Sequence, residues 1–327
     1  MRAEQVLEVQ HLKTYFPTQK GILHAVDDVS FSMEKGKTLG VVGESGCGKS
    51  TLGRTILHLL ESTDGRILFH GEDVTRVDRR RLRKLREHMQ IIFQDPFSSL
   101  NPRMSVREII KEPLILKGGR TRQEMEEKVE ELMGVVGLDR RLAFSYPHEL
   151  DGGRRQRIGI ARALALDPEF LVCDEPVSAL DVSIQAQILN LMEDLQEERG
   201  LTYMFITHDL SVVRYISDEI AVMYLGQIVE KAPAEELFSH TLHPYTKALL
   251  SAIPVPDIHT KRKRILLKGE LTSPVNPKPG CRFRARCPYE CEECRKPQEL
   301  REIVPEHYVA CHRSRELAGM PVFPEGL

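Results

Sequence analysis

The sequence has no run of eighteen uncharged apolar residues, so no segment is expected to cross a membrane as a helix. The first ten residues, MRAEQVLEVQ, also lack the apolar stretch of a signal peptide, and we expect the protein to stay in the cytoplasm. Neither sign of charge is in excess, because 46 Lys and Arg face 48 Asp and Glu. No overall field therefore favours nucleic acid as a partner. The basic segment DRRRLRKLR at 78–86 is accordingly predicted to be a solvated helix face.

Internal repeats are also missing, and only one phosphate-loop pattern occurs, so we expect a single nucleotide-binding core. In the pattern Gly-x-x-x-x-Gly-Lys-Ser, backbone N–H groups surround the phosphates of ATP or GTP, Lys49 reaches the outer phosphates and Ser50 offers its hydroxyl to Mg²⁺. A strand pattern precedes this loop and a helical pattern follows it, which is the context that the motif needs. The predicted nucleotide-binding residues of the loop are Gly43, Glu44, Ser45, Gly46, Cys47, Gly48, Lys49, Ser50 and Thr51.

The remaining pattern predicts an α/β protein. Residues 5–42 alternate apolar and polar positions as strands do, and the stretch from about 96 to 158 reads as a helical insertion. The apolar runs EFLVCDE and LTYMFITHD, separated by a helical segment, indicate parallel strands that are covered on both faces. Beyond Pro254 the composition turns to Pro, Lys, Arg and Cys. We therefore expect an ATPase domain at 1–255 and a small Cys-rich region at 256–327.

Two carboxylates end the apolar strand FLVCDE. Asp174 is placed to hold Mg²⁺ through water, and Glu175 is placed to orient or deprotonate an attacking water. The alternative is that both are ordinary exposed carboxylates at a strand end. An intact phosphate loop in the same chain favours the catalytic interpretation.

The order of the motifs makes the sequence more specific than any one of them. The phosphate loop, IIFQDP, LDGGRRQR, CDEP, SALD and ITHD follow one another as in the ATPase subunit of ABC transporters, which residues 5–230 resemble. This resemblance implies a P-loop core with a RecA-like parallel sheet, an N-terminal antiparallel β subdomain and a helical insertion. It also implies that Gln94 contacts Mg²⁺ and senses a membrane subunit, and that Gly152 and Gly153 belong to the signature loop. By the same resemblance Asp181 lies in the loop that links the two sites, and His208 lies near the γ-phosphate.

In the family that this chain resembles, two ATPase subunits pack head to tail around two nucleotides, and an aromatic ring stacks on adenine. LKTYFP offers Phe16, which we favour, or Tyr15 for that ring; the alternative is a strand aromatic in the core. The signature loop departs from the usual Leu-Ser-Gly-Gly-Gln by carrying Asp151 and Arg154. Arg154 either pairs with Asp151 or reaches the nucleotide itself, and the alternative is that Asp151 simply caps the helix. A chain with this loop is expected to pair with a related but different ATPase subunit.

The C-terminal part resembles peptide-importer ATPases through HTLHPYTKALLSAIPVPD at 240–257 and SPVNPKPGCRFRARCP after it, a tail that nickel importers largely share. The resemblance implies that four cysteines ligate a [4Fe–4S] cluster, spaced C-x5-C-x6-C-x16-C: Cys281, Cys287, Cys294 and Cys311. No redox partner is evident, so we expect the cluster to stabilise a small, poorly packed tail. Four thiolates also suit zinc, whose short sites usually contain a C-x2-C pair, here Cys291 with Cys294. Disulfides rank third in a reducing compartment.

These motifs together predict an ATPase subunit at the cytoplasmic face of the membrane that energises an importer for oligopeptides or dipeptides. Expected partners are two membrane-spanning permease subunits, the second ATPase subunit and, indirectly, an external solute-binding protein. One alternative is an importer of nickel or another solute. Others are a soluble ATPase of the same fold and an iron–sulfur protein with a vestigial ATP site. The intact Lys49, Asp174, Glu175 and His208 argue against the last of these.

Overall fold

The computed structural model describes residues 4–253, 265–267, 269 and 273–317, so the expected boundary near residue 255 lies outside the described residues. The chain forms two compact units, and it passes between them several times. The first unit consists of Met1–Val6, Met33–Lys37 and Arg76–Ile206, and the second of Leu7–Ser32, Thr38–Thr75 and Thr207–Leu327. The phosphate loop therefore belongs to the second unit, whereas Asp174, Glu175 and Gln94 belong to the first.

Parallel strands form the centre of the first unit. Strand β6 (Met89–Ile92) pairs with β7 (Phe170–Asp174), and β7 pairs with β8 (Thr202–Thr207). Every residue of β7 and β8 is buried, as expected for parallel strands with both faces covered. The two apolar runs were correctly predicted to be strands.

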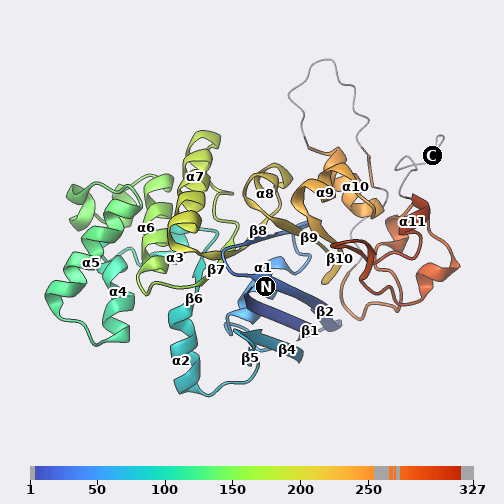
Figure 1. The fold of residues 1–327 in the computed structure, drawn as a ribbon, viewed down its shortest axis with the longest axis horizontal. Helices are drawn as coiled ribbons and strands as arrows, with labels where there is room; N and C mark the ends of the chain where they lie inside the picture. The colour runs from blue at the N-terminus through green and yellow to red at the C-terminus, as the bar shows by residue number, and fades with distance from the viewer. Residues whose placement is uncertain (1–3, 254–264, 268, 270–272, 318–327) are drawn as a thin grey trace, which may run out of the picture. The chain divides into compact units, whose positions relative to one another are not determined.

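Helices make up most of the rest of the first unit (Figure 1). Helices α4, α5 and α6 pack against one another, and capping boxes at Ser105 with Glu108 and at Thr121 with Glu124 begin α4 and α5. In α2 only Leu85 is buried, which confirms the solvated basic helix. The bounds are α2 Arg79–His88, α3 Pro96–Ser99, α4 Val106–Lys117, α5 Arg122–Val135, η1 Arg140–Phe144, η2 Pro147–Glu149, α6 Gly152–Leu164 and α7 Val182–Arg199.

The second unit contains an antiparallel sheet in the order β2-β1-β4-β5, formed by β2 (Gly21–Glu34), β1 (Gln5–Thr18), β4 (Asp64–Phe69) and β5 (Glu72–Asp73). In its other sheet β3 (Thr38–Val42) lies parallel to β9 (Glu219–Tyr224), and β10 (Gln227–Pro233) is antiparallel to β9. This combination of parallel and antiparallel strands agrees with the fold class expected from the sequence. The helices are α1 Lys49–Ile56, α8 Leu210–Ile216, α9 Ala234–Ser239, α10 Pro244–Ser251 and α11 Ser314–Leu317. Within the described ranges, no helix is both long enough and apolar enough to span a bilayer.

The Cys-rich tail adds two strands to this second sheet, which its composition did not indicate. Strand β12 (His307–Val309) pairs with β10, and β11 (Arg301–Val304) pairs with β12. Between Cys281 and Cys311 lie two short 3₁₀ turns, η3 (Arg284–Arg286) and η4 (Glu292–Arg295). The tail is therefore built into the unit that carries the phosphate loop.

A buried ion pair fixes β12 to β10. His307 and Glu230 are both fully buried, and His307 Nε2 lies 2.9 Å from Glu230 Oε1. Glu230 also accepts hydrogen bonds from the backbone N–H groups of Leu242 and His243, at 2.7 and 3.2 Å. His307 Nδ1 lies 3.5 Å from a carboxylate oxygen of Glu236. Burial lowers the pKa of His307, but the hydrogen bonds and charges of Glu230 and Glu236 outweigh burial and raise it overall.

We expect this pair to make the stability of the protein depend on pH. Because the pKa of His307 is raised by folding, its stabilising contribution is fully present below about pH 6.5, the usual histidine value, and is lost as pH rises through the folded-state pKa. His307→Gln should therefore destabilise the protein more at pH 6 than at pH 9, as measured by urea unfolding. The exposed His11, paired with Asp28, provides the control, and His11→Gln should change little at either pH. An equal loss at both pH values for His307→Gln would contradict the ion pair.

Candidate functional site

The phosphate loop joins β3 to α1, and two of its glycines are required by close backbone contacts. Gly43 has φ of 153°, and a Cβ there would lie 2.2 Å from the carbonyl oxygen of Met223. Gly48 has φ of 107°, and a Cβ there would lie 2.0 Å from the carbonyl oxygen of Ala25. Any larger residue would push the loop away from both neighbours. The sequence motif thus reflects how tightly this backbone is held.

Lys49 lies inside the curve of the loop. Its side chain is almost completely buried, and its ammonium donates hydrogen bonds to the carbonyls of Gly43 and Glu44, at 2.8 and 3.2 Å. The neighbouring Cys47 is buried, and burial raises the pKa of its thiol, so the thiol is neutral at pH 7. Ser50 follows Lys49 in the first turn of α1. The loop therefore presents one buried cation and the start of a helix, which suits the binding of phosphates.

In the first unit, the structure brings together two residues that the sequence placed in the site. Glu175 follows buried β7, and its carboxylate accepts a hydrogen bond of 2.9 Å from the Gln94 side-chain amide. Glu175 adopts φ of 47°, a left-handed conformation that is uncommon for a residue with a side chain. A hydrogen bond of 2.9 Å from its N–H to Ile206 O holds the backbone there. Asp174, the last residue of β7, is 1% exposed.

Asp151 begins α6 and makes both contacts that the sequence left as alternatives. One carboxylate oxygen accepts a hydrogen bond from Arg154 N at 2.8 Å, which caps the helix. The other lies 3.3 Å from the Arg154 guanidinium. Gly152 and Gly153 follow directly, and a Cβ on Gly153 would lie 2.6 Å from the Ile184 side chain. More than half of each charged side chain is exposed, so the ion pair is worth about 0–1 kcal/mol.

The other predicted residues occupy the ends of elements. Asp181 caps α7 by accepting a hydrogen bond of 3.0 Å from Ile184 N, and this bond, together with one from Ser183, lowers the pKa of Asp181. His208 is exposed and comes directly after β8. Their assignment to a nucleotide site remains a prediction.

The two aromatic candidates differ in their surroundings. The Tyr15 ring stacks on His24, with ring centroids 4.0 Å apart, and its hydroxyl donates a hydrogen bond to Asp27. Burial and the Asp27 carboxylate raise the pKa of Tyr15. Phe16 is half-buried. The choice between them as the ring that stacks on adenine remains a prediction.

Sequence reasoning missed two contacts to the phosphate loop. The hydroxyl of Tyr245, on α10, accepts a hydrogen bond of 2.9 Å from Glu44 N. The guanidinium of Arg286, on η3, binds both carboxylate oxygens of Glu44, at 2.8 and 3.2 Å. In the sequence, the segment around Tyr245 indicated only the resemblance to peptide-importer ATPases. No local pattern marks either contact, because more than 200 residues separate the partners in sequence.

Four tail cysteines face one small cavity in the second unit. It is lined by Cys281, Cys287, Cys294 and Cys311, among other residues. All seven cysteines are described, and each has a free thiol. Burial raises the pKa of Cys281 to about 11 and that of Cys287 to about 12, so without a metal these thiols are protonated at neutral pH. The four residues predicted to be ligands thus lie around the same space.

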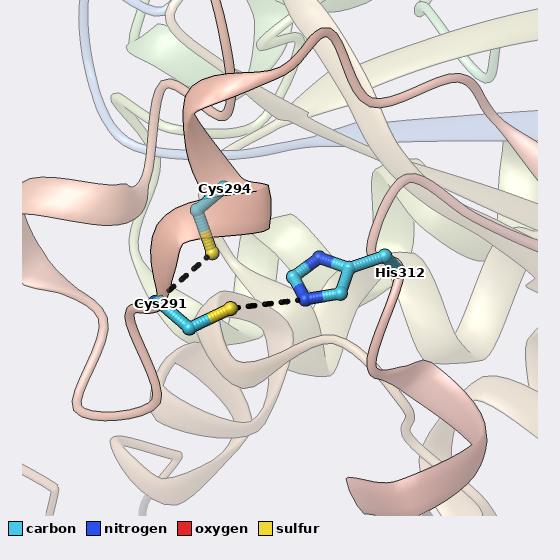
Figure 2. Close-up of side chains that lie close together, drawn as sticks. All are labelled: Cys291, Cys294 and His312. Atoms are coloured by element: carbon cyan, nitrogen blue, oxygen red, sulfur yellow. Dashed lines mark hydrogen bonds between the residues drawn. The ribbon is translucent and has the colours of Figure 1, made fainter.

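Figure 2 shows a second grouping, which shares Cys294 with the first. The sulfur of Cys291 lies 3.2 Å from His312 Nε2, and Cys291 N donates to the sulfur of Cys294 at 3.5 Å. One ligand atom from each of the three residues lies within 4.8 Å of the others. This spacing suits one ion rather than a cluster of several.

Comparisons with known proteins agree with the motifs. The sequence model described as "ABC transporter" matches residues 26–178, and that described as "Oligopeptide/dipeptide transporter, C-terminal region" matches residues 229–294. The chain is 55% identical over 320 residues to the oligopeptide transport ATP-binding protein AppF of Bacillus subtilis, covering 94% of this chain and 97% of that protein. It is 54% identical to the oligopeptide transport ATP-binding protein OppF of the same organism, covering 94% and 96% of the two chains.

A solved structure supports the same fold. The ATP-binding cassette MJ0796, in a dimeric post-hydrolysis state bound to ADP and Pi, superposes with a TM-score of 0.65 at 28% identity. The match covers 70% of this chain and 98% of that one. The α/β P-loop fold class expected from the sequence is confirmed.

Replacing the carboxylate of Glu175 should separate binding from turnover. We expect Glu175→Gln to keep nucleotide affinity and to lower phosphate release by about 10²-fold or more, because an amide does not act as a base. Lys49→Ala is the contrasting variant, since it deletes a charge partner of the phosphates and should weaken binding itself. Both are measured by equilibrium binding of ATP and by phosphate release. Unchanged turnover in Glu175→Gln would remove this residue from the reaction.

Proposed function

Because the chain belongs to the ABC transporter family, as a relative of its oligopeptide transport ATP-binding proteins, we propose that it is the ATP-hydrolysing subunit of an importer for oligopeptides or dipeptides. The observation that carries this proposal is the pairing of a complete phosphate loop with the peptide-type C-terminal region in one chain. ATP and Mg²⁺ are the cofactors of such a site. Sequence likeness to peptide transport proteins over nearly the whole chain favours peptides over nickel as the imported solute.

Each predicted site residue has a distinct role in this proposal. By the family resemblance, Lys49 and the loop backbone would bind the phosphates, and Ser50, Asp174 and Gln94 would hold Mg²⁺. Glu175 orients the attacking water and takes its proton. The hydrogen bond from Gln94 holds the Glu175 carboxylate in place. Because Gln94 bonds this carboxylate, a movement of Gln94 would reposition the base.

The proposed function also implies which proteins this subunit binds. The subunit dimerises and docks on membrane-spanning permease subunits as a peripheral protein. We further infer that it works at the cytoplasmic face, that its ATPase partner is a related but different chain, and that an external solute-binding protein delivers the peptide. Asp151 and Arg154 in the signature position support the heterodimer, since an altered loop is best matched by a partner that supplies the usual one.

Co-purification tests the transport role. Affinity capture of this chain from membranes of its native source should recover two permeases and a second ATPase subunit. Reconstituted in vesicles, the assembly should take up short peptides when ATP is supplied on the side of this subunit. The Glu175→Gln assembly is the matched control and should form but not transport. Recovery of a ribosomal or DNA-repair assembly without permeases would instead support a soluble ATPase.

We also propose that Cys281, Cys287, Cys294 and Cys311 hold a [4Fe–4S] cluster. The support is the cavity that all four line, together with the agreement between their number and the four thiolates that such a cluster takes. The cluster would supply four strong bonds to a tail that contributes few apolar side chains to the core. A structural role follows, because such a tail gains stability from cross-links.

Zinc is the second candidate, and the group in Figure 2 favours it. Cys291, Cys294 and His312 provide the thiolate and imidazole ligands that zinc prefers, and Cys291 and Cys294 form a C-x2-C pair. Since Cys294 belongs to both sets, the cluster and the zinc ion exclude each other.

Metal analysis of single-cysteine variants separates the two sites. Protein purified without oxygen should be brown and contain about four iron and four sulfide per chain. Cys287→Ser should lose the iron, whereas Cys291→Ser should keep it. Stoichiometric zinc that survives in Cys287→Ser and disappears in Cys291→Ser would establish the three-residue site and overturn the cluster.

A further inference from the structure

The tail loop between Cys281 and Cys287 carries an arginine beside each of these cysteines. Arg282 follows Cys281, and Arg286 precedes Cys287. The cysteines line the cavity of the tail, but both guanidinium groups bind residues of the nucleotide-binding region. One short loop therefore connects the cysteine cavity to that region.

Arg286 binds the phosphate loop through two parallel hydrogen bonds. Its NH1 and NH2 groups donate to the two carboxylate oxygens of Glu44, at 2.8 and 3.2 Å. The Arg286 side chain is 9% exposed and that of Glu44 24%, so water screens the pair only weakly. Charge-assisted bonds of this two-pronged kind are the strongest that side chains make, and they also fix orientation. Tyr245 accepts from the Glu44 N–H at 2.9 Å, so both the side chain and the backbone of Glu44 are held.

Glu44 in turn contacts the residue that binds phosphate. Its carbonyl accepts hydrogen bonds from Lys49 Nζ and from Cys47 N, both at 3.2 Å. A displacement of Glu44 would therefore move a hydrogen-bond acceptor of the Lys49 ammonium. In this way Arg286 acts on Lys49 through Glu44.

Arg282 reaches the same loop by another route. Its guanidinium donates to the carbonyl of Leu225 and to the carboxylate of Asp27. The next residue, Gly226, donates its N–H to Cys47 O at 2.7 Å and accepts from Asp27 N at 2.8 Å. Two arginines, each within five residues of both Cys281 and Cys287, thus contact the phosphate loop or residues bonded to it.

We propose that Arg286 is a positioning residue for the phosphate loop. We also propose that a metal group bound in the cysteine cavity raises nucleotide affinity, acting through the tail loop between Cys281 and Cys287 that carries Arg286. The second half rests on the proposed cluster. A group bound to Cys281 and Cys287 fixes both ends of this loop, and so fixes the guanidinium that binds Glu44. By linkage, bound nucleotide must strengthen the hold on the metal by the same factor.

The test of the first half is ATP binding by equilibrium dialysis with Mg²⁺, in a Glu175→Gln background that prevents turnover. Arg286→Gln should weaken ATP binding about 10-fold, within the usual range of coupling between sites. Arg286→Lys keeps the charge but loses the two-pronged geometry, and should fall between Arg286→Gln and the parent. Glu44→Gln should match Arg286→Gln, and the double variant should be no worse than either, because one interaction is removed.

Arg284→Gln is the matched control. Arg284 lies in the same turn, and in the described part of the chain it pairs with no carboxylate. It should bind ATP as the parent does. Unchanged ATP affinity in Arg286→Gln, an equal loss in Arg284→Gln, or simple additivity with Glu44→Gln would each overturn the positioning role. Thermal unfolding and iron content of every variant distinguish a misplaced loop from a tail that has not folded.

The second half is tested by removing the metal. Iron-stripped protein should bind ATP about 10-fold more weakly than loaded protein, and ATP should slow the release of iron to a chelator. This difference should vanish in Arg286→Gln. Equal ATP affinity of loaded and stripped protein would overturn the link. Protein that never contains iron would overturn both the cluster and the link, while the Arg286→Gln measurement on that protein still decides the positioning role.

Discussion

The close approach of the phosphate loop to its neighbouring backbone is the constraint on which much of the second unit depends. At Gly43 and Gly48 a single extra carbon would collide with the carbonyls of Met223 and Ala25. These contacts hold the loop against Met223 in β9 and against Ala25 in the first half of β2. A hydrogen bond of 2.7 Å from Gly226 N to Cys47 O is a third contact that holds the loop. Affinity for a nucleotide follows from this rigidity, because N–H groups that are already in place need not be ordered on binding.

The Cys-rich tail contributes further contacts to the region around the phosphate loop. Its strand β12 is held to β10 by the buried pair of His307 and Glu230. Separating the two strands would leave the Glu230 carboxylate without its His307 partner, which is costly. Phe283 packs against Tyr224 and Tyr245, with ring centroids 5.3 and 5.5 Å apart. These apolar and charged contacts place the cysteine loop against the nucleotide-binding part of the same unit. The cysteine cavity is therefore a neighbour of the phosphate loop in structure, although some 240 residues separate them in sequence.

How much the sequence could predict depended on the distance along the chain between the contacting residues. The phosphate loop and the strand ending in Asp174 were predictable because each function is encoded within ten consecutive residues. The hydrogen bond between Gln94 and Glu175 was not predicted, because 81 residues separate them and the family resemblance assigned Gln94 only to Mg²⁺ and to sensing a membrane subunit. Arg286 and Tyr245 were missed because an arginine between two cysteines and a tyrosine in an amphipathic helix are common surface and core residues. Strands β11 and β12 were missed because strands of four and three residues are too short to show the apolar alternation that marks longer ones.

The signature position shows how a departure from a motif can be offset locally. From sequence alone, an aspartate at the start of α6 should repel an anion. In the structure its first oxygen is engaged by Arg154 N and its second lies beside the Arg154 guanidinium. The two substituted residues together carry no net charge. The cap also replaces what a serine hydroxyl would have done for the helix, because either side chain accepts the same N–H. What the pair does not replace is the hydroxyl donor, since an ionised carboxylate only accepts hydrogen bonds. Any hydrogen-bond donor for a phosphate at this end of α6 must therefore come from the helix N–H groups or from Arg154 itself. The altered loop would then bind an anion through the Arg154 charge and the backbone N–H groups, and not through a serine hydroxyl.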